Sequence, residues 1–152
     1  MYNEVSIKFK RLSNEFDNIP LPSYATEGSS GMDIRAVLKN PLFLKPNEME
    51  LIPTNISVEI PIGFELQVRP RSGLAAKHGI GILNSPGTID SDYRGEIKII
   101  MMNFGKDEFI IQPGDRIAQL VVSKIYKAKI EESEKLKTSN RGDGGFGHTG
   151  KL

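Results

Sequence analysis

Alternation of apolar and polar residues along short segments is the feature that most constrains how this chain folds. It is clearest at residues 5–10, 56–60 and 64–69, where Val, Ile, Phe and Leu alternate with polar and charged residues. This period of two belongs to strands with one buried face, whereas a helix repeats its apolar residues every three or four positions. Glycine and proline, with 15 and 9 residues respectively, separate the segments. The pattern predicts an all-β sandwich or barrel.

Weaker signals predict the remaining elements. Further strands are expected at residues 97–104, 109–111, 117–122 and 126–130, with turns at 61–63 and 112–115. The first of these strands is almost continuously apolar, so we expect both of its faces to be covered. One short helix is predicted at residues 72–78, with Ser72 as its N-cap and Gly79 as its end. A second, weaker helical signal lies in the acidic segment 131–137.

The C-terminal segment differs in composition from the rest of the chain. Residues 138–152 contain five glycines and one aromatic residue, Phe146. Such a segment cannot form a core of its own, so we divide the chain into a β-core at residues 1–137 and an arm at 138–152. Two interpretations of the arm stay open. It is a disordered terminus, or it orders over a ligand, since an arginine, a ring and bare backbone amides suit a flat aromatic group attached to phosphates.

Composition excludes several function classes. The 152 residues, a typical single-domain length, include 20 basic and 19 acidic side chains, and this balance argues against a nucleic-acid partner. The absence of cysteine excludes disulfides and thiolate nucleophiles, and two histidines argue against a zinc site caged by protein ligands. The N-terminus has no signal-peptide pattern, and the longest apolar run is four residues. We therefore expect a cytoplasmic location and no membrane partner.

Two segments carry groups suited to phosphate chemistry. In residues 69–75, Arg71, Ser72 and Gly73 open the predicted helix, and a guanidinium, a hydroxyl and free amides together favour an anion. The alternative is a solvated arginine pair beside an ordinary N-cap. Residues 84–98 predict a hairpin that carries Asp90, Asp92 and Tyr93 near its turn.

A carboxylate in that hairpin could activate water beside a bound phosphate or hold a metal, and the alternative is an ordinary acidic turn. Spacing does not decide between Asp90 and Asp92. Gln119 lies among apolar residues and needs a polar partner, either a backbone carbonyl or a ligand oxygen. Asp33 opens another strand and alone says little.

Five segments taken in order resemble the five motifs of the homotrimeric deoxyuridine triphosphate nucleotidohydrolases (dUTPases). They are residues 30–36, 69–75, 87–97 with Asn84 upstream, 114–120 and 141–150. The resemblance implies a jelly-roll subunit and a homotrimer with three active sites at subunit contacts. It also implies hydrolysis of dUTP to dUMP and pyrophosphate, with Mg²⁺ bound through the triphosphate.

The resemblance also implies roles for single residues. Asp90 would be the base that activates water, Tyr93 would contact the deoxyribose, and Phe146 would stack on the uracil. The uracil edge would be bound by Asn84 and by the backbone of the segment that includes Thr88, Ile89 and Lys98. The phosphates would be bound by Arg71, Ser72, Gly73 and Gln119, and by the arm through Arg141, Gly147 and His148. Asp33 would contact the water shell of Mg²⁺ or a neighbouring subunit.

Some positions depart from the family pattern, and two other functions stay open. His148 stands where the family usually has Ser or Thr, so the pH response of binding is expected to differ. Met32 replaces a frequent aromatic residue, and Asp143 adds a negative charge to the arm. The alternatives are a dCTP deaminase-like enzyme of the same fold and a non-catalytic dUTP-sensing binding protein. The segment Asp90-Ser91-Asp92-Tyr93 favours hydrolysis over deamination.

Overall fold

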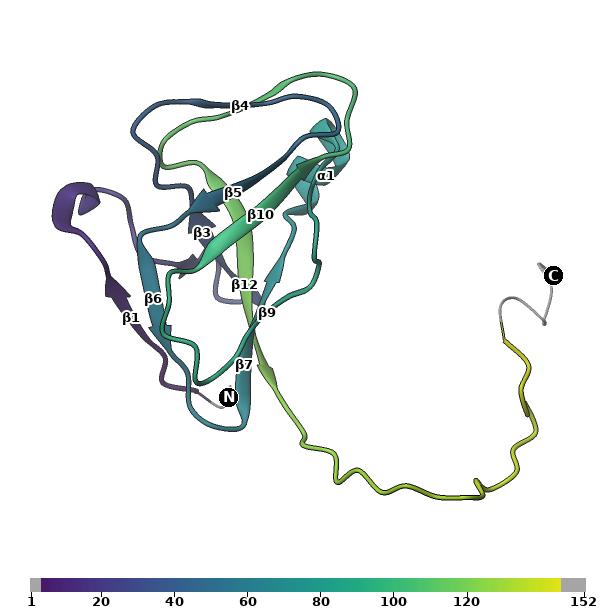
Figure 1. The fold of residues 1–152 in the computed structure, drawn as a ribbon. Coiled ribbons are helices and arrows are strands. Elements are labelled where there is room, and N and C mark those ends of the chain that lie inside the picture. The colour runs from purple at the N-terminus through teal and green to yellow at the C-terminus, as the bar shows by residue number, and fades with distance from the viewer. Residues whose placement is uncertain (1–3, 146–152) are drawn as a thin grey trace.

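The chain folds as an all-β sandwich with one α-helix in residues 4–145, the part that this computed structural model describes (Figure 1). The elements are β1 (Lys8–Arg11), a 3-10 helix (Asn14–Phe16), β2 (Ser23–Tyr24), β3 (Gly31–Arg35), β4 (Leu42–Leu44), β5 (Met49–Pro53), β6 (Ile56–Glu59), β7 (Phe64–Arg69), α1 (Ser72–His78), β8 (Ile80–Ile82), β9 (Gly87–Ile89), β10 (Lys98–Asn103), β11 (Phe109–Ile111) and β12 (Arg116–Lys124).

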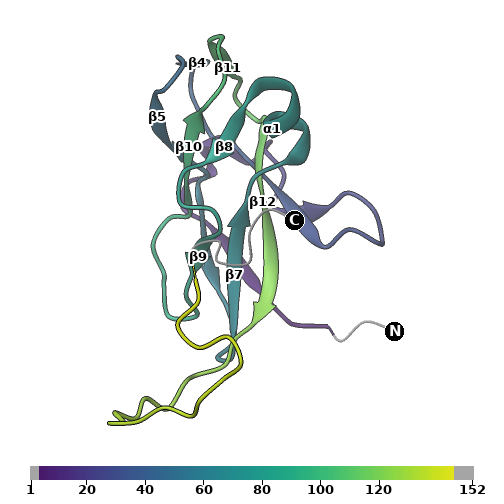
Figure 2. The same ribbon diagram turned by 90° about the vertical axis from the view of Figure 1, so that its right-hand side faces the viewer.

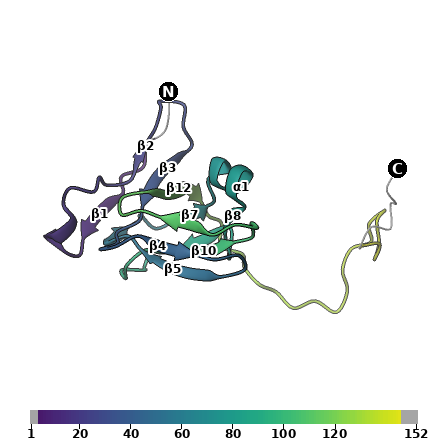
Figure 3. The ribbon, with the colours of Figure 1, turned by 90° about the horizontal axis from the view of Figure 1, so that it is seen from above.

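Two main sheets form the layers of the sandwich. One has the strand order β2-β3-β12-β7-β9 and the other β5-β10-β8, with the pairs β1-β6 and β4-β11 beside them. Figure 3 shows β3, β12 and β7 in one layer and β4, β10 and β5 in the other. Between them lies one apolar core, whose fully buried members include Ile34, Leu66 and Leu120 from the first layer and Ile52 and Ile99 from the second. The predicted jelly-roll-like β class is confirmed.

The sequence patterns located several of the strands, and they failed where the chain had no neighbouring strand to pair with. The segments predicted at residues 56–60, 64–69, 109–111 and 117–122 are β6, β7, β11 and β12. The strand predicted at 126–130 and the helix at 131–137 are wrong, because the chain leaves the body after β12 and forms neither element there (Figure 1). Tyr126 and Ile130 are 87% and 92% exposed, so their apolar pattern has no surface to pack against.

The strand predicted at 97–104 is β10, but its cover is incomplete. Ile99, Met101 and Asn103 are buried, whereas Ile100 and Met102 on the opposite face remain partly exposed. The expectation that both faces are covered is therefore wrong for a single copy of the chain.

Helix α1 ends as predicted, and its first residue is Ser72, the residue predicted as its cap. Gly79 has φ +68°, and its N–H donates to the carbonyls of Leu74 and Ala75. A left-handed conformation at this position favours glycine. The N-cap is Arg71 rather than Ser72, and no side chain caps the first turn. No helix within residues 4–145 has the length and apolarity needed to cross a membrane.

Asn103 connects the loop after β10 to β4 from a fully buried position. Its Nδ2 donates to the carbonyl oxygens of Leu44, at 2.8 Å, and Asp107, at 2.9 Å. Its Oδ1 accepts from the N–H of Gly105 at 2.9 Å. A buried amide is stable only when such bonds are made, so this side chain fixes the loop after β10 against β4.

Replacing Asn103 by leucine should destabilise the protein by about 3 kcal/mol, because three backbone groups lose their partner and each such loss costs ~1–3 kcal/mol. Urea unfolding measures the change. Asn140→Leu, at an exposed position beyond the last strand, is the control and should stay within ~0.5 kcal/mol of the original chain. Equal effects of the two substitutions would contradict this role for Asn103.

Candidate active site

The candidate site residues that precede the arm lie in two separate cavities. The first, of about 430 Å³, is lined by Asn84, Gly87, Thr88, Ile89, Asp90, Tyr93, Lys98 and neighbouring apolar residues. The second, of about 320 Å³, is lined by Asp33, Arg71, Ser72, Gly73, Arg116, Gln119 and residues 25 and 29–31. The two cavities share no lining residue. A base candidate and a phosphate-binding candidate are thus placed apart within one copy.

The first cavity lies where the two sheets meet at strand β9. This strand pairs with β7, Thr88 opposite Gln67, while β10 pairs with β5 on one edge and β8 on the other. The predicted hairpin between residues 84 and 98 is therefore wrong as a two-stranded ladder, because β10 has no free edge for β9. Residues 90–97 instead form a loop that connects the sheets.

Strand β9 presents backbone groups to this cavity. It is the last strand of its sheet, so in the described part of the chain its outer edge has no ladder partner. Asn84 lies beside it, because a Cβ added at Gly87 would be 3.3 Å from Asn84 Nδ2 and 3.1 Å from Val68 Cβ. A carboxamide next to free amides and carbonyls can hydrogen-bond the edge of a flat polar ring.

The loop that carries Asp90 is tied by its own backbone and by Arg94. The N–H of Tyr93 donates to the carbonyl of Asp90 at 3.1 Å. Arg94 Nη1 donates to the carbonyls of Ser91, at 2.7 Å, and Tyr93, at 2.8 Å. Asp90 itself is exposed at the cavity, directly after β9. Sequence reasoning did not identify Arg94, since an arginine near a turn carries no specific signal.

Tyr93 is held against the same loop by contacts on two sides. Its hydroxyl donates to the carbonyl of Glu96 at 3.0 Å. Its ring covers Gly95, where an added Cβ would lie 2.6 Å from Tyr93 Cζ. Glu96 Oε1 in turn accepts from the N–H of Asn55 at 2.9 Å, and Glu96 Oε2 lies 3.7 Å from Lys98 Nζ. The ring position therefore depends on a glycine and on a loop tied to the core.

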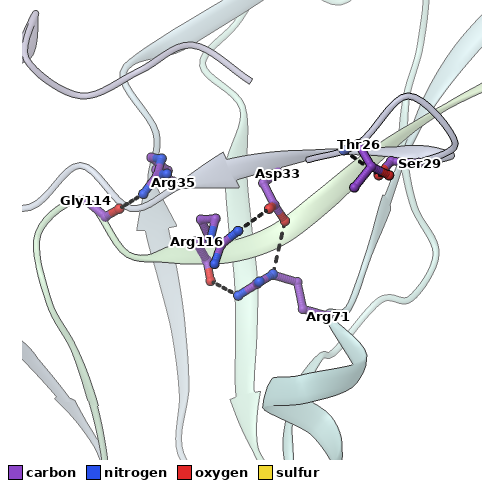
Figure 4. A network of polar contacts seen from close by, with 7 residues as sticks. All are labelled: Thr26, Ser29, Asp33, Arg35, Arg71, Gly114 and Arg116. Atoms are coloured by element: carbon purple, nitrogen blue, oxygen red, sulfur yellow. Dashed lines mark hydrogen bonds and ion pairs between the residues drawn. The ribbon is translucent and has the colours of Figure 1, made fainter. Parts of the chain in front are cut away.

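The second cavity contains a carboxylate between two guanidinium groups (Figure 4). Asp33 Oδ1 lies 3.0 Å from Arg71 Nε, and Asp33 Oδ2 accepts from Arg116 Nη1 at 3.0 Å. Gln119 has the backbone partner that the sequence left open, since its Nε2 donates to the carbonyl of Pro70 at 3.0 Å. Its Oε1 lies so close to Gly31 that a side chain there would displace it.

The arm is described only in its first part. Arg141 donates from Nε to the carbonyl of Gly144 at 2.7 Å, within a local turn that includes Gly142 at φ +57°. Figure 1 shows this segment away from the strands, and in the view of Figure 2 it overlaps β9 and β7. Phe146, Gly147 and His148 lie outside the described residues.

The chain offers no cage for a metal ion within residues 4–145, where no three His, Asp or Glu side chains are grouped to bind one. Asp33 and Asp90 stand in different cavities, and both oxygens of Asp33 face guanidinium groups. This donor set fits an ion that is held through the phosphates of a ligand rather than by side chains alone.

Comparisons with known proteins identify the family of the chain. A family model described as dUTPase matches residues 17–150. The chain belongs to the dUTPase family. It is 55% identical over 144 residues to a deoxyuridine 5'-triphosphate nucleotidohydrolase of Rickettsia bellii, with 95% of each chain covered. It is 59% identical over 131 residues to that of Chlamydia pneumoniae, covering 86% of this chain and 90% of the other.

Solved structures of dUTPases share the fold. A point mutant of the dUTPase from phage 80alpha matches with a TM-score of 0.82 and 26% identity over 94% of this chain and 98% of the other. A structure of the Staphylococcus bacteriophage 80alpha dUTPase with dUpNHpp, a dUTP analogue, matches with a TM-score of 0.78 and 26% identity, covering 95% and 98%. The family is one of hydrolases.

Proposed function

We propose that this chain hydrolyses dUTP to dUMP and pyrophosphate as a homotrimer, in sites that each combine the first cavity of one copy with the second cavity of another. The separation of the two cavities is the observation that carries the shared site. Strands β3 and β9 stand three places apart in the order β3-β12-β7-β9, or about 14 Å at the ~4.8 Å spacing of neighbouring strands. In each active site, one copy supplies the first cavity and a second copy supplies the second cavity.

Asp90 acts as the general base in this proposal. Its carboxylate takes a proton from water, the water oxygen attacks the α-phosphorus, and the bond from that phosphorus to the bridging oxygen breaks. Pyrophosphate leaves and dUMP remains. The exposed position of Asp90 at the cavity gives a water molecule access to it.

Phosphate binding falls to Arg71, Ser72, Gly73 and Gln119 in the second cavity. Two guanidiniums share one carboxylate there, so one positive charge remains in excess and attracts the anionic triphosphate. Mg²⁺ bound through the phosphates would neutralise further charge on their oxygens. Positioning and charge neutralisation are the main demands of phosphoryl transfer.

Base and sugar selection fall to the first cavity. Asn84 and the backbone at Thr88, Ile89 and Lys98 pair with the uracil edge, and cytosine would present the opposite donor and acceptor there. Tyr93 contacts the deoxyribose and leaves no room for a ribose 2′-hydroxyl. The unpaired edge of β9 and the fixed ring of Tyr93 support this assignment.

The arm completes the proposal. Residues 1–137 form the core, and residues 138–152 close over the bound nucleotide. Phe146 stacks on the uracil. The phosphates are bound by Arg141, Gly147 and His148. The exposed, strand-free course of residues 125–145 leaves the arm available to reach a site. The cytoplasmic location stays a prediction.

Asp90→Asn should lower kcat by at least 100-fold, in line with the ~10²–10⁴ that a general base contributes, because an amide cannot accept the proton of water. Pyrophosphate release measures kcat, and calorimetry with dUpNHpp should show binding retained. Asp92→Asn is the matched control, two residues away in the same loop. If instead kcat fell only in Asp92→Asn, the general base would be Asp92, and the assignment to Asp90 would be wrong.

Three further results from the unchanged chain would contradict the proposal itself. Ammonia release from dCTP would favour the deaminase, and tight dUpNHpp binding without turnover of dUTP would favour the binding protein. Full turnover of dUTP by a species that sediments as a monomer would contradict an active site shared between two copies.

Gly95→Ala should lower kcat/KM for dUTP because the added methyl displaces the ring of Tyr93. We expect a decrease of about tenfold, which corresponds to ~1.4 kcal/mol of transition-state stabilisation. Discrimination against UTP should fall as well, because the ring no longer occupies the space of a 2′-hydroxyl. Gly28→Ala is the control, since an added Cβ at Gly28 meets no atom within 4 Å. Unchanged dUTP/UTP selectivity in Gly95→Ala would contradict the role of Tyr93.

A chain that ends at Thr138 should keep its fold and its trimer, because every strand of the described structure precedes that residue. It should lose most turnover, because the arm that closes over the nucleotide is missing. Sedimentation reports the trimer, and pyrophosphate release reports the activity. Full activity in the shortened chain would show that the arm is not needed for closure.

A further inference from the structure

The ring of Tyr93 is held to its own loop rather than to the sheets. Its hydroxyl donates to the carbonyl of Glu96 at 3.0 Å, and the ring covers Gly95. Both partners belong to residues 90–97, the loop that connects the sheets, and Tyr93 remains 45% exposed. The position of the ring in the first cavity therefore depends on what attaches this loop to the body of the protein.

The end of the loop is attached to the turn between β5 and β6. Glu96 Oε1 accepts from the N–H of Asn55 at 2.9 Å, and the N–H of Ile97 donates to the carbonyl of Ile56 at 2.8 Å. The first of these bonds has an ionised acceptor, and such a bond is about twice as strong as a neutral one. Arg94 contributes less, because its short bonds are to carbonyls within the loop and its contact with a carbonyl of β6 is longer, at 3.5 Å.

Asn55 binds Glu96 from a left-handed backbone conformation. Its φ is +58°, and asparagine adopts this conformation more readily than most other residues with a side chain. Asn55 is 7% exposed, so its N–H needs a partner inside the protein. Glu96 is that partner, and its own side chain is 22% exposed. Losing this bond would leave a buried donor unpaired, which is costly.

The side chain of Asn55 binds the N-terminal segment at two points. Its Oδ1 accepts from the N–H of Ser13 at 2.9 Å, and its Nδ2 donates to the carbonyl of Ser13 at 2.8 Å. The N–H of Leu12 adds a bond to the carbonyl of Asn55 at 3.0 Å. A continuous series of hydrogen bonds thus leads from the residues after β1 through Asn55 and Glu96 to Tyr93. Asn55 itself does not line the first cavity.

We infer that Glu96 and Asn55 are positioning residues that act through Tyr93 and thereby set the discrimination between deoxyribose and ribose. The inference rests on the proposed function, in which the ring of Tyr93 occupies the space of a 2′-hydroxyl. A ring that moves with a loosened loop would leave that space open. Recognition of the base does not depend on the same bonds, since β9 is held by its ladder with β7 and Lys98 by its ladder with β5. Loss of the series should therefore lower sugar selectivity and leave base selectivity intact.

Glu96→Ala removes the acceptor for the N–H of Asn55 and tests the inference through two selectivities. We expect the ratio of kcat/KM for dUTP to that for UTP to fall about tenfold, the factor that corresponds to one lost bond to a charged group. The ratio for dUTP and dCTP should stay within about twofold of the original, since the base-binding strands keep their ladders. Pyrophosphate release measures both. An unchanged dUTP/UTP ratio, or an equal fall of both ratios, would overturn the inference.

Glu96→Gln separates positioning from a direct contact with the nucleotide. Glutamine keeps a side-chain oxygen that accepts from the N–H of Asn55 but carries no charge. We therefore expect Glu96→Gln to restore most of the dUTP/UTP ratio that Glu96→Ala loses. A glutamine variant as unselective as the alanine variant would show that Glu96 acts through its charge, and the positioning role would be wrong.

Two asparagines with similar backbone conformations provide a matched pair for the second residue. Asn55→Gly keeps the left-handed backbone and the N–H that Glu96 accepts, but it removes the carboxamide that binds Ser13. The dUTP/UTP ratio should fall, by less than in Glu96→Ala. Asn47→Gly is the control, because Asn47 has φ +65° in the turn before β5 and is exposed, and its ratio should be unchanged. Equal ratios in the two glycine variants would overturn the role of Asn55.

A double-mutant cycle tests whether Glu96 acts through Tyr93. Glu96→Ala, Tyr93→Ala and the double variant are compared for the dUTP/UTP ratio. We expect the double variant to equal Tyr93→Ala alone, because a positioning residue then has nothing left to position. A full further loss in the double variant would contradict the inference.

Folding and the proposed function are checked separately. Thermal unfolding shows whether each variant is folded, and Asn55→Gly replaces Glu96→Ala in the same cycle if the latter is not. The proposed function itself fails if the unchanged chain neither binds dUpNHpp nor releases pyrophosphate from dUTP. The positioning role alone fails if the unchanged chain discriminates against UTP and the Glu96→Ala chain does so equally well.

Discussion

The pairing of β12 on both of its edges is the constraint on which the rest of the structure depends. It bonds to β3 along one edge and to β7 along the other, and so joins three segments far apart in the chain. Ala118 and Leu120 on its inner face are fully buried. A shift of register by one residue would move these side chains out of the core, so the inner face determines which polar residues meet on the outer face.

Local sequence located strands well but could not determine their partners. The alternation in residues 64–69 was sufficient to place β7, because that strand has one buried face whatever its neighbours are. The hairpin at residues 84–98 failed for the opposite reason. Which strands pair depends on which edges are free, and both edges of β10 were taken by segments distant in sequence. Residues 126–130 have a strand-like pattern but pair with no strand of the described chain.

The chemistry of the candidate site was easier to predict than its geometry. A carboxylate, a phenol, a guanidinium and an amide could be named from their motifs, and their roles stay predictions. Their division between two cavities could not be derived from local sequence, since it follows from strand order, although the family resemblance implied active sites at subunit contacts. The contact of Arg116 with Asp33 was also missed, although the adjacent apolar residues Ile117 and Ala118 break the alternation and could have indicated the register shift in β12.

Strand β9 gives the first cavity a property that side chains alone would not provide. Hydrogen bonds from a strand's main chain do not depend on which side chains the strand carries. The exposed side chain of Thr88 can therefore change without altering those bonds, whereas Ile89 is held by the core. Selectivity that depends on these main-chain hydrogen bonds would be lost if the strand moved, but not if a contacting side chain were replaced. Evolution could then vary the rim of the cavity widely and still keep one ligand, as long as the sheet behind it stays rigid.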